Sequence, residues 1–416
     1  MEKLQKPREP FSPIDCNGRT TSGSRRSHFK RGGILTSVPS WRWLLLLGAM
    51  SRAIVLALGL LAGWSRTSDM GTPEQPSMEA SYPNDAQAAL LSRGSRPIVE
   101  PWYRFDANWY AEILRIGYRY EPNGKCTAAF MPLLPVCMAG AERIGIDPYW
   151  AGLILPNIIF VVGLGFFGKW VFDVTQDGEL TRRACWLVVA FPFGLFFSAP
   201  YHEAFAFCFC SLALWAWRRD RILLTALALA LAGTARLTTL AVGLGLFLEW
   251  FQLPRAERKS LWKVLFVGIG NILGVLMFCF YLQSVTGEFF AHPLSHVGWG
   301  RVPPSRAGFV QSAEWILERK NLGAEVLCTF GFLVLGVRAW FKRGFLCGFL
   351  ILFPVIQALS TGSLLSMQRI VLACFPAFIE MADCLRSRLL FRASLVACLG
   401  LQVLMVYRYI NWLFVG

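Results

Sequence analysis

Residues 43–63 read WLLLLGAMSRAIVLALGLLAG, an apolar run that only Arg52 interrupts. Similar tracts recur as far as the C-terminus, and roughly 20 apolar residues are enough to cross a bilayer as a helix. Backbone groups inside lipid must find their hydrogen bonds within the protein, which helices of this length allow. The sequence therefore predicts an all-α polytopic membrane protein in which Arg52 faces protein or water.

Composition supports this class and excludes others. Of the 416 residues, 55% are hydrophobic and 16% are charged, whereas soluble domains average about 25% charged residues. The net charge of +15 comes from basic residues in short loops, which is typical of membrane topology and not of a nucleic-acid surface. The 12 cysteines show no zinc-binding spacing, so we expect small apolar side chains and no metal site.

Residues 1–40 are polar and basic and are predicted to form a disordered cytoplasmic tail before one membrane domain, 41–416. The segment 128–142 would rise only about 22 Å, too little to cross, so we predict that it does not span. Five basic loops then fall on the side of the N-terminus, as the positive-inside rule requires: Arg182–Arg183, 218–221, 255–259, Lys342–Arg343 and 386–392. The prediction is a bundle of about eleven transmembrane helices: 43–63, 149–172, 184–200, 202–217, 221–235, 237–251, 262–285, 322–340, 344–360, 367–384 and 391–413.

The division of 221–251 at GTARLTT, 233–239, is one of two alternatives, because one long helix would also fit. In the predicted topology the polar intervals collect on the non-cytoplasmic side. Polar groups at membrane depth are costly and usually functional, so this face is the expected site. The intervals are 64–127, SAPYHEAF at 198–205, GTARLTT, 286–321 and STGSLLSMQR at 360–369.

The loop 64–127 ends in RFDANWYAEILRIGY, residues 104–118. Phe105, Trp109, Ile113 and Ile116 recur at helical spacing, which predicts an amphipathic helix lying in the membrane interface. Asp106 stands in its first turn. Two interpretations carry equal weight from spacing alone: a helix-capping carboxylate and a catalytic one.

Four stretches in this order resemble the PIG-V-like mannosyltransferases, relatives of GPI mannosyltransferase 2 among the GT-C membrane glycosyltransferases. The first is RFDANWYAEILRIGY with FMPLLP, which resembles W-D-x-x-W-Y-x-x-I-x-x-x-G-Y and F-F-P-L-Y-P. The others are FPFGLFFSAPYHEAFAF, LALALAGTARLTTLAVGL and SMQRIVLACFPAF. The chain departs from the family pattern at Phe105, Met131, His202, Leu237 and Gln368.

The resemblance implies a GT-C-like fold and inverting transfer of mannose. It also implies a polyprenyl- or dolichyl-phosphate-linked donor, a glycolipid or other glycan acceptor on the non-cytoplasmic side, and Asp106 as the base. A departing phosphate needs no general acid, but its charge calls for fixed cations. Arg236 and Arg369 are candidates for that role; the alternative is that each pairs structurally with Glu203. We also expect Tyr201, His202, Glu203, Trp109 and Tyr110 at the substrate, with a purely structural role equally open for His202 and Glu203.

In the loop 286–321, His292 and His296 have the spacing of a metal-binding helical pair, but Pro293 breaks such a helix. We expect acceptor contacts there, with Trp299 and Arg301 at a sugar. The sequence has no nucleotide-sugar or Walker motif. No cofactor is predicted besides the lipid-phosphate-linked sugar that serves as substrate. Metal dependence and a protein subunit stay open.

Rival interpretations are a secondary transporter, since GTARLTT resembles a broken transporter helix, and a lipid flippase or scaffold in which Asp106 only caps a helix. No second copy of the broken segment is present, which disfavours the transporter. The expected location is an integral membrane position with a cytoplasmic N-terminus, in a bacterial cytoplasmic membrane or the endoplasmic reticulum.

Overall fold

The structure is a computed structural model and describes residues 37–68, 98–318 and 323–415. Every regular element within these ranges is a helix, as predicted. The predicted tail, 1–40, lies outside the described residues except for 37–40, and so does the part 69–97 of the loop 64–127.

Five helices are long and apolar enough to cross a membrane. At 1.5 Å per residue, a helix of 20 residues rises about 30 Å, the thickness of the hydrocarbon core. These five confirm an integral membrane architecture by length and composition. They are α1 (Trp41–Ser68), α6 (Pro148–Thr175), α11 (Leu261–Thr286), α14 (Ala324–Arg343) and α18 (Arg388–Ile410).

The other predicted spans are shorter helices, so the count of eleven is not confirmed. The prediction for 184–200 is wrong in its bounds, because the helix ends before Pro192, which cannot continue the hydrogen-bond ladder. The prediction for 367–384 is wrong too, because that segment is broken before Pro376. The shorter helices are α7 (Gly178–Ala190), α8 (Glu203–Arg218), α9 (Ile222–Ala235), α10 (Leu240–Gln252), α15 (Phe345–Leu359), α16 (Met367–Ile370) and α17 (Ala377–Cys384).

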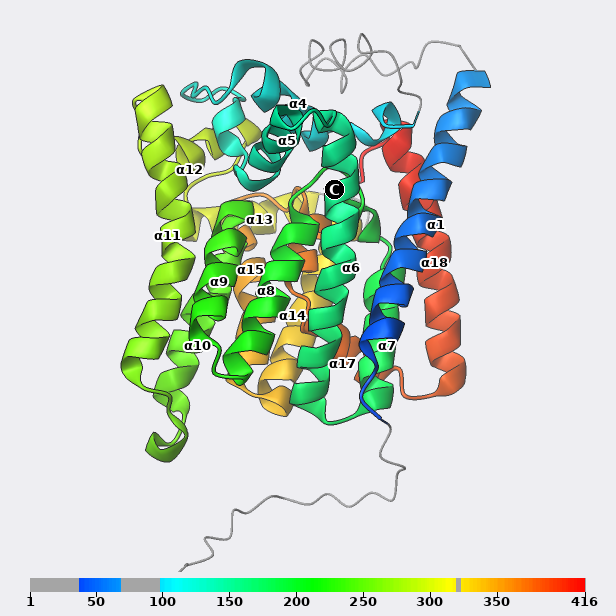
Figure 1. Ribbon diagram of the computed structural model, residues 1–416, viewed down its shortest axis with the longest axis vertical. Coiled ribbons are helices and arrows are strands. Elements are labelled where there is room, and N and C mark those ends of the chain that lie inside the picture. The colour runs from blue at the N-terminus through cyan, green and yellow to red at the C-terminus, as the bar shows by residue number, and fades with distance from the viewer. Residues whose placement is uncertain (1–36, 69–97, 319–322, 416) are drawn as a thin grey trace, which may run out of the picture. The chain divides into compact units, whose positions relative to one another are not determined.

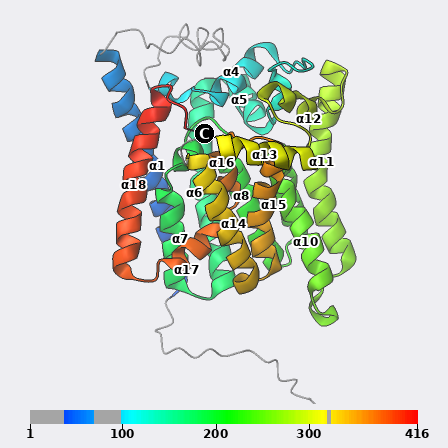
Figure 2. The ribbon, with the colours of Figure 1, turned by 180° about the vertical axis from the view of Figure 1, so that it is seen from behind.

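Helix α6 lies inside the bundle and α18 at its edge. In the apolar 18-residue stretch of each helix, 61% of the residues are buried in α6 and only 11% in α18. Helix α6 packs on α8, α8 on α9, and α9 on α11, while α1 lies between α6 and α18 (Figure 1). Helices α14 and α15 form a neighbouring pair, best seen from behind (Figure 2).

Short helices collect at one end of this bundle (Figure 1), where the polar intervals were expected. They are α4 (Asp106–Ile116), α5 (Leu133–Arg143) and α12 (Ala291–Ser295), with α13 (Arg306–Glu318) packed on α15. Helix α5 has 11 residues and rises about 16 Å, well short of the hydrocarbon core; that 128–142 does not cross the membrane stays a prediction.

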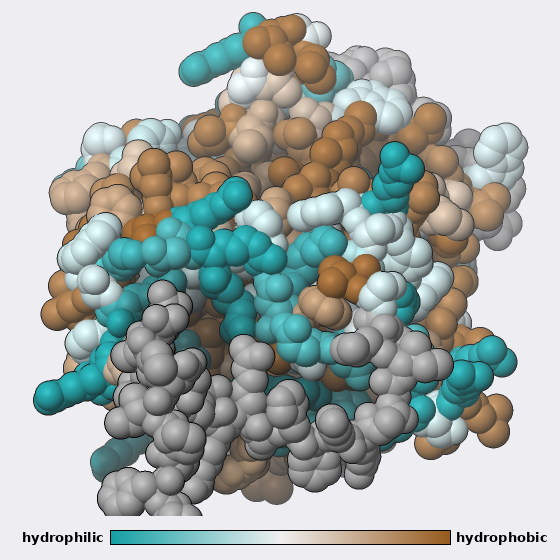
Figure 3. All heavy atoms as spheres, turned by 60° about the horizontal axis from the view of Figure 1, so that its bottom comes forward, coloured by the Kyte–Doolittle hydropathy of each residue, from teal (hydrophilic) through white to brown (hydrophobic). Residues whose placement is uncertain are grey.

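The five basic loops lie together at the opposite end, where Figure 3 shows a hydrophilic patch bordered by apolar surface. Ion pairs link neighbouring loops. Arg219 binds Asp173, and Lys259 binds Asp220 at 2.7 Å. Arg343, at the end of α14, binds Glu380 of α17 at 2.7 Å. The grouping matches the expected topology; which side of the membrane this end faces stays a prediction.

Helix α4 differs from the expected interfacial helix. Residues 107–113 are all buried, including the polar residues Asn108 and Glu112. The cover comes from α5 and from the 3-10 turn η2 (Thr127–Ala129), on which α12 packs. The amphipathic period identified the helix. The turn η2 and the helix α5, which follow it in the chain, enclose it within the protein.

Helices α9 and α11 approach closely through small residues, which is typical of helix pairs in membranes. A Cβ placed on Gly274 would collide with the carbonyl oxygen of Ala230, whereas one on Gly268 of the same helix meets nothing within 4 Å. The contact therefore depends on the absence of a side chain at Gly274.

We expect Gly274→Leu to destabilise the protein by about 1–3 kcal/mol, because the added side chain forces the two helices apart. Gly268→Leu is the matched control and should leave the melting temperature of the detergent-solubilised protein unchanged. Equal melting temperatures for the two variants would show that this contact does not hold the bundle.

Candidate active site

Asp106 is the first residue of α4, and an unusual backbone precedes it. Phe105 has φ 54° and ψ −125°, a conformation that is costly for a residue with a side chain and is found mostly at functional positions. Its ring packs on Tyr409 and Trp412 with ring centroids 5.8 and 5.3 Å apart. The C-terminal segment thus holds the turn that presents Asp106.

Four charged residues form one chain of ion pairs. Arg369 binds Asp106 through Nη1, and its Nε donates to Glu203 Oε1 at 2.8 Å. Arg236 binds the same Glu203 oxygen through Nη1. The side chain of Glu203 is 1% exposed, while that of Asp106 is 20% exposed. We call these four residues the charge cluster.

The cluster draws its members from segments where helices begin or break. Arg236 is extended, φ −155° and ψ 139°, between α9 and the 3-10 turn η4 (Leu237–Thr239), so the predicted division at GTARLTT is confirmed. Arg369 follows Ser366, which has φ 64°. Glu203 begins α8, where a negative charge interacts favourably with the helix dipole.

This geometry bears on the alternatives left open by the sequence. Asp106 lies inside α4 and not before it, and its side chain pairs with Arg369, so helix capping does not account for its whole role. Both Arg236 and Arg369 do pair with Glu203, as the structural alternative stated. However, Nε and Nη2 of Arg236 make no hydrogen bond within the described residues, so two donors stay available.

A third arginine lies nearby. Arg301 donates from Nη1 to Thr361 Oγ1 at 3.1 Å and from Nη2 to the Leu365 carbonyl at 2.6 Å. Its pKa falls to about 10, first because it is buried and then because Arg236 and Arg369 repel its charge. Three arginines thus face two carboxylates, and this excess of positive charge suits an anion. The sequence suggested Arg301 only as a sugar contact.

Tyr201 and His202 support the cluster from the turn before α8. The guanidinium carbon of Arg369 lies 4.5 Å from the centre of the Tyr201 ring, a cation–π contact. His202 Nδ1 lies 2.8 Å from the Tyr110 hydroxyl, and its Nε2 accepts a hydrogen bond from the Leu134 N–H at 3.0 Å. The structure therefore brings Tyr110, Tyr201 and His202 together beside the charge cluster.

Trp109 belongs to an aromatic group. It stacks on Phe130 with centroids 5.6 Å apart and meets Trp299 edge-on at 5.5 Å. His292 and His296 lie 5.0 Å apart, ring to ring, and His292 Nδ1 contacts the Ala128 carbonyl at 2.9 Å. Among the described residues no third His, Cys, Asp or Glu joins them as a metal group would require.

Polar side chains of α1 and α6 hold the turn that leads to Glu203. Arg52 of α1 is buried and donates to the Gly194 carbonyl at 2.8 Å and to Ser198 Oγ at 2.9 Å. Asn157 of α6 donates to the Ser198 carbonyl at 3.0 Å. Arg52 faces protein, as expected from its cost in lipid. Its carbonyl and hydroxyl partners carry no sequence signal, so its link to the site was not foreseen.

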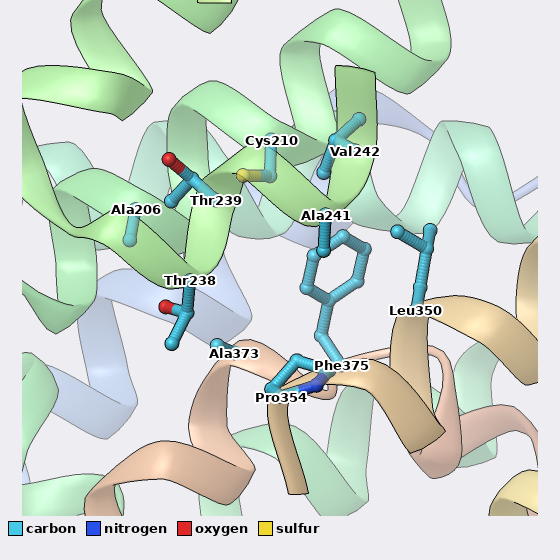
Figure 4. A pocket seen from close by; sticks show the side chains of 10 residues that line it. All are labelled: Ala206, Cys210, Thr238, Thr239, Ala241, Val242, Leu350, Pro354, Ala373 and Phe375. Carbon is cyan, nitrogen blue, oxygen red and sulfur yellow. The ribbon is translucent and has the colours of Figure 1, made fainter. Parts of the chain in front are cut away.

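A small, mostly apolar pocket lies among α8, η4, α10 and α15 (Figure 4). Three of its lining residues follow members of the charge cluster in the chain: Ala206 comes three residues after Glu203, Thr238 two after Arg236, and Ala373 four after Arg369. The Thr238 hydroxyl is buried and has no hydrogen-bond partner within the described residues. The remaining lining residues are Cys210, Thr239, Ala241, Val242, Leu350, Pro354 and Phe375.

Comparison with known protein families and with curated proteins finds no match to this sequence. Among solved structures, the fold is distantly similar to a crystal structure of the Archaeoglobus fulgidus oligosaccharyltransferase in complex with zinc and sulfate. The TM-score is 0.37 and the sequence identity is 12%, over 76% of this chain and 49% of that one. The chain thus spans about half the length of that relative. None of these comparisons supports the PIG-V-like subfamily, so that resemblance rests on the quoted motifs.

Acid should destabilise the protein through His202. Burial lowers its pKa to about 3, so between pH 6.5 and about 3 the unfolded chain binds a proton that the folded chain does not. The free energy of unfolding should therefore fall as pH falls, by up to about 1.4 kcal/mol per pH unit for one such histidine.

Chemical denaturation in detergent at pH 6.5 and pH 5.0 checks this expectation. In His202→Gln the free energy of unfolding should depend less on pH than in wild type, by the slope that corresponds to about one proton taken up on unfolding. An unchanged slope would mean that His202 binds a proton in the folded protein as readily as in the unfolded chain.

Proposed function

We propose that this chain is a membrane glycosyltransferase of the GT-C type. Its reaction is inverting transfer of mannose from a polyprenyl- or dolichyl-phosphate-linked donor to an acceptor hydroxyl on the non-cytoplasmic side. One observation carries the proposal: a partly exposed carboxylate and an excess of arginines gather in one cluster. That arrangement suits a substrate that brings a hydroxyl to the carboxylate and a phosphate to the arginines.

Asp106 is the proposed base. One of its carboxylate oxygens pairs with Arg369, and the other, Oδ1, has no hydrogen bond within the described residues. In the proposed step Oδ1 takes the proton of the acceptor's hydroxyl group. At the same time the acceptor's hydroxyl oxygen forms its bond to the anomeric carbon. The bond from this carbon to the phosphate oxygen breaks, and the lipid phosphate leaves with the electron pair. Attack from the face opposite the phosphate inverts the configuration.

Arg236 and Arg301 are the proposed phosphate partners. Arg236 keeps two free donors within the described residues, and Arg301 adds a positive charge that forms no ion pair with a carboxylate there. Negative charge grows on the phosphate oxygens as the bond breaks, so fixed donors stabilise the transition state more than the bound substrate. Arg369, held by Asp106 and Glu203, orients the base.

Replacing Asp106 by Asn tests the base. We expect kcat for transfer of labelled mannose from a polyprenyl-phosphate donor to fall by roughly 10²–10⁴-fold, because the amide cannot accept the proton. Glu112→Gln is the matched control: this carboxyl lies on the same helix but pairs with Arg115 at 2.7 Å, and its variant should retain transfer.

Two outcomes would count against the proposal. Full transfer by Asp106→Asn would remove the base. Wild-type protein that transfers no sugar but moves a solute into proteoliposomes, with loss of uptake in Asp106→Asn, would favour the transporter alternative.

Arg236→Gln tests the phosphate contact. We expect the KM for the lipid-phosphate donor to rise about 10- to 100-fold, since a charge-assisted hydrogen bond is lost, while the KM for the acceptor stays near wild type. Glu203 keeps Arg369 as a partner, so the fold should tolerate the change. Arg219→Gln removes the same charge at the opposite end, where Arg219 pairs with Asp173, and should alter neither constant.

A further inference from the structure

The starting point is a buried histidine whose two ring nitrogens both have partners. Leu134 lies in the first turn of α5, where backbone N–H groups have no partner within the helix. Its N–H donates to His202 Nε2 at 3.0 Å. A backbone N–H can only donate, so Nε2 must present its lone pair and carries no proton.

The single proton of a neutral imidazole therefore sits on Nδ1. Nδ1 lies 2.8 Å from the Tyr110 hydroxyl oxygen, and the ring N–H donates to that oxygen. The phenol accepts this bond, and its own proton is left over. Within the described residues no group accepts that proton, because Tyr110 makes no other hydrogen bond there.

The position of Tyr110 directs the unused proton toward the charge cluster. Tyr110 follows Asp106 by four residues on α4, so the two side chains lie on one face of the helix. Its ring meets Tyr201 edge-on at 6.2 Å, and Tyr201 lies under Arg369. Burial raises the pKa of the Tyr110 phenol well above its usual value, so the group stays a neutral donor.

We infer that Tyr110 donates a hydrogen bond to an oxygen of the substrate beside Asp106, and that neutral His202 is the positioning residue that aims it. The inference rests on the proposed function for the identity of that substrate. A phosphate oxygen and a sugar oxygen of the lipid-linked substrate share the required chemistry, because each offers a lone pair to the uncharged Tyr110 hydroxyl. His202 itself, whose two nitrogens are both occupied, does not contact substrate.

Kinetics of Tyr110→Phe test the donor. We expect kcat/KM to fall about tenfold, the effect of one neutral hydrogen bond, with an unchanged melting temperature. A phosphate partner predicts that the loss persists with every sugar carried by the donor. A sugar-hydroxyl partner predicts that a donor whose sugar lacks that hydroxyl is used equally by wild type and Tyr110→Phe.

A double-mutant cycle separates positioning from general support of the fold. If His202 acts through the phenol, His202→Gln lowers kcat/KM in wild type but has little further effect in Tyr110→Phe, and the two losses are not additive. Additive losses would assign His202 a separate role and overturn the positioning part of the inference.

Nitrogen-15 NMR of histidine-labelled protein reads the tautomer without any activity. The chain contains 4 histidines, so His202→Gln identifies the signal. We expect a protonated Nδ1 and a bare Nε2 at neutral pH; a protonated Nε2 would overturn the inference whether or not the protein transfers sugar.

The two proposals fail in different ways. If wild type transfers mannose, Asp106→Asn does not, and Tyr110→Phe matches wild type in kcat/KM with every donor, the inference fails and the proposed function stands. If wild type transfers no sugar from any polyprenyl-phosphate donor, the proposed function fails, and the tautomer still decides how Tyr110 is oriented.

Discussion

The fold around the site depends on one buried carboxylate, Glu203. Its Oε1 accepts from both Arg236 and Arg369, and through Arg369 it is linked to Asp106. With both arginines removed, Glu203 would be a buried charge without a partner, and breaking such a buried pair costs about 3–5 kcal/mol. The pairing therefore fixes α4, α8, α16 and the break after α9 relative to one another before any substrate binds.

This network explains why helices end where they do. A continuous helix through 221–251 would carry Arg236 past the other charges, and the extended residue at the break instead points it back toward Glu203. Phe105 and Ser366, both with positive φ, precede Asp106 and Arg369. Such backbone strain persists only where surrounding packing holds it; aromatic contacts to Phe105 provide that packing on one side.

Much of this could be read from the sequence, because the signals were local. Helical spacing identified α4, the polar residues of GTARLTT identified the break, and the length of 128–142 identified a segment too short to span. Prolines at 192 and 376 were visible too and would have corrected two span boundaries. The excess of basic loops at one end followed from their positions along the chain alone.

The rest required three-dimensional contacts. No local pattern shows that η2 and α5 enclose α4, that Arg52 supports the turn before Glu203, or that the Leu134 N–H fixes the tautomer of His202. Two of these contacts run to backbone groups, the Gly194 carbonyl and the Leu134 N–H, which every residue carries, so residue types could not single them out. The charged residues of the site could be predicted from the sequence. The backbone contacts that orient them could not.

The most direct measurement is a cryo-electron microscopy structure with a bound, non-transferable polyprenyl-phosphate mannose analogue. The account predicts phosphate oxygens within hydrogen-bond distance of Arg236 and Arg301 and the anomeric carbon facing Asp106. A phosphate bound elsewhere, with the ion pairs of Glu203 undisturbed and Asp106 remote from the sugar, would contradict it.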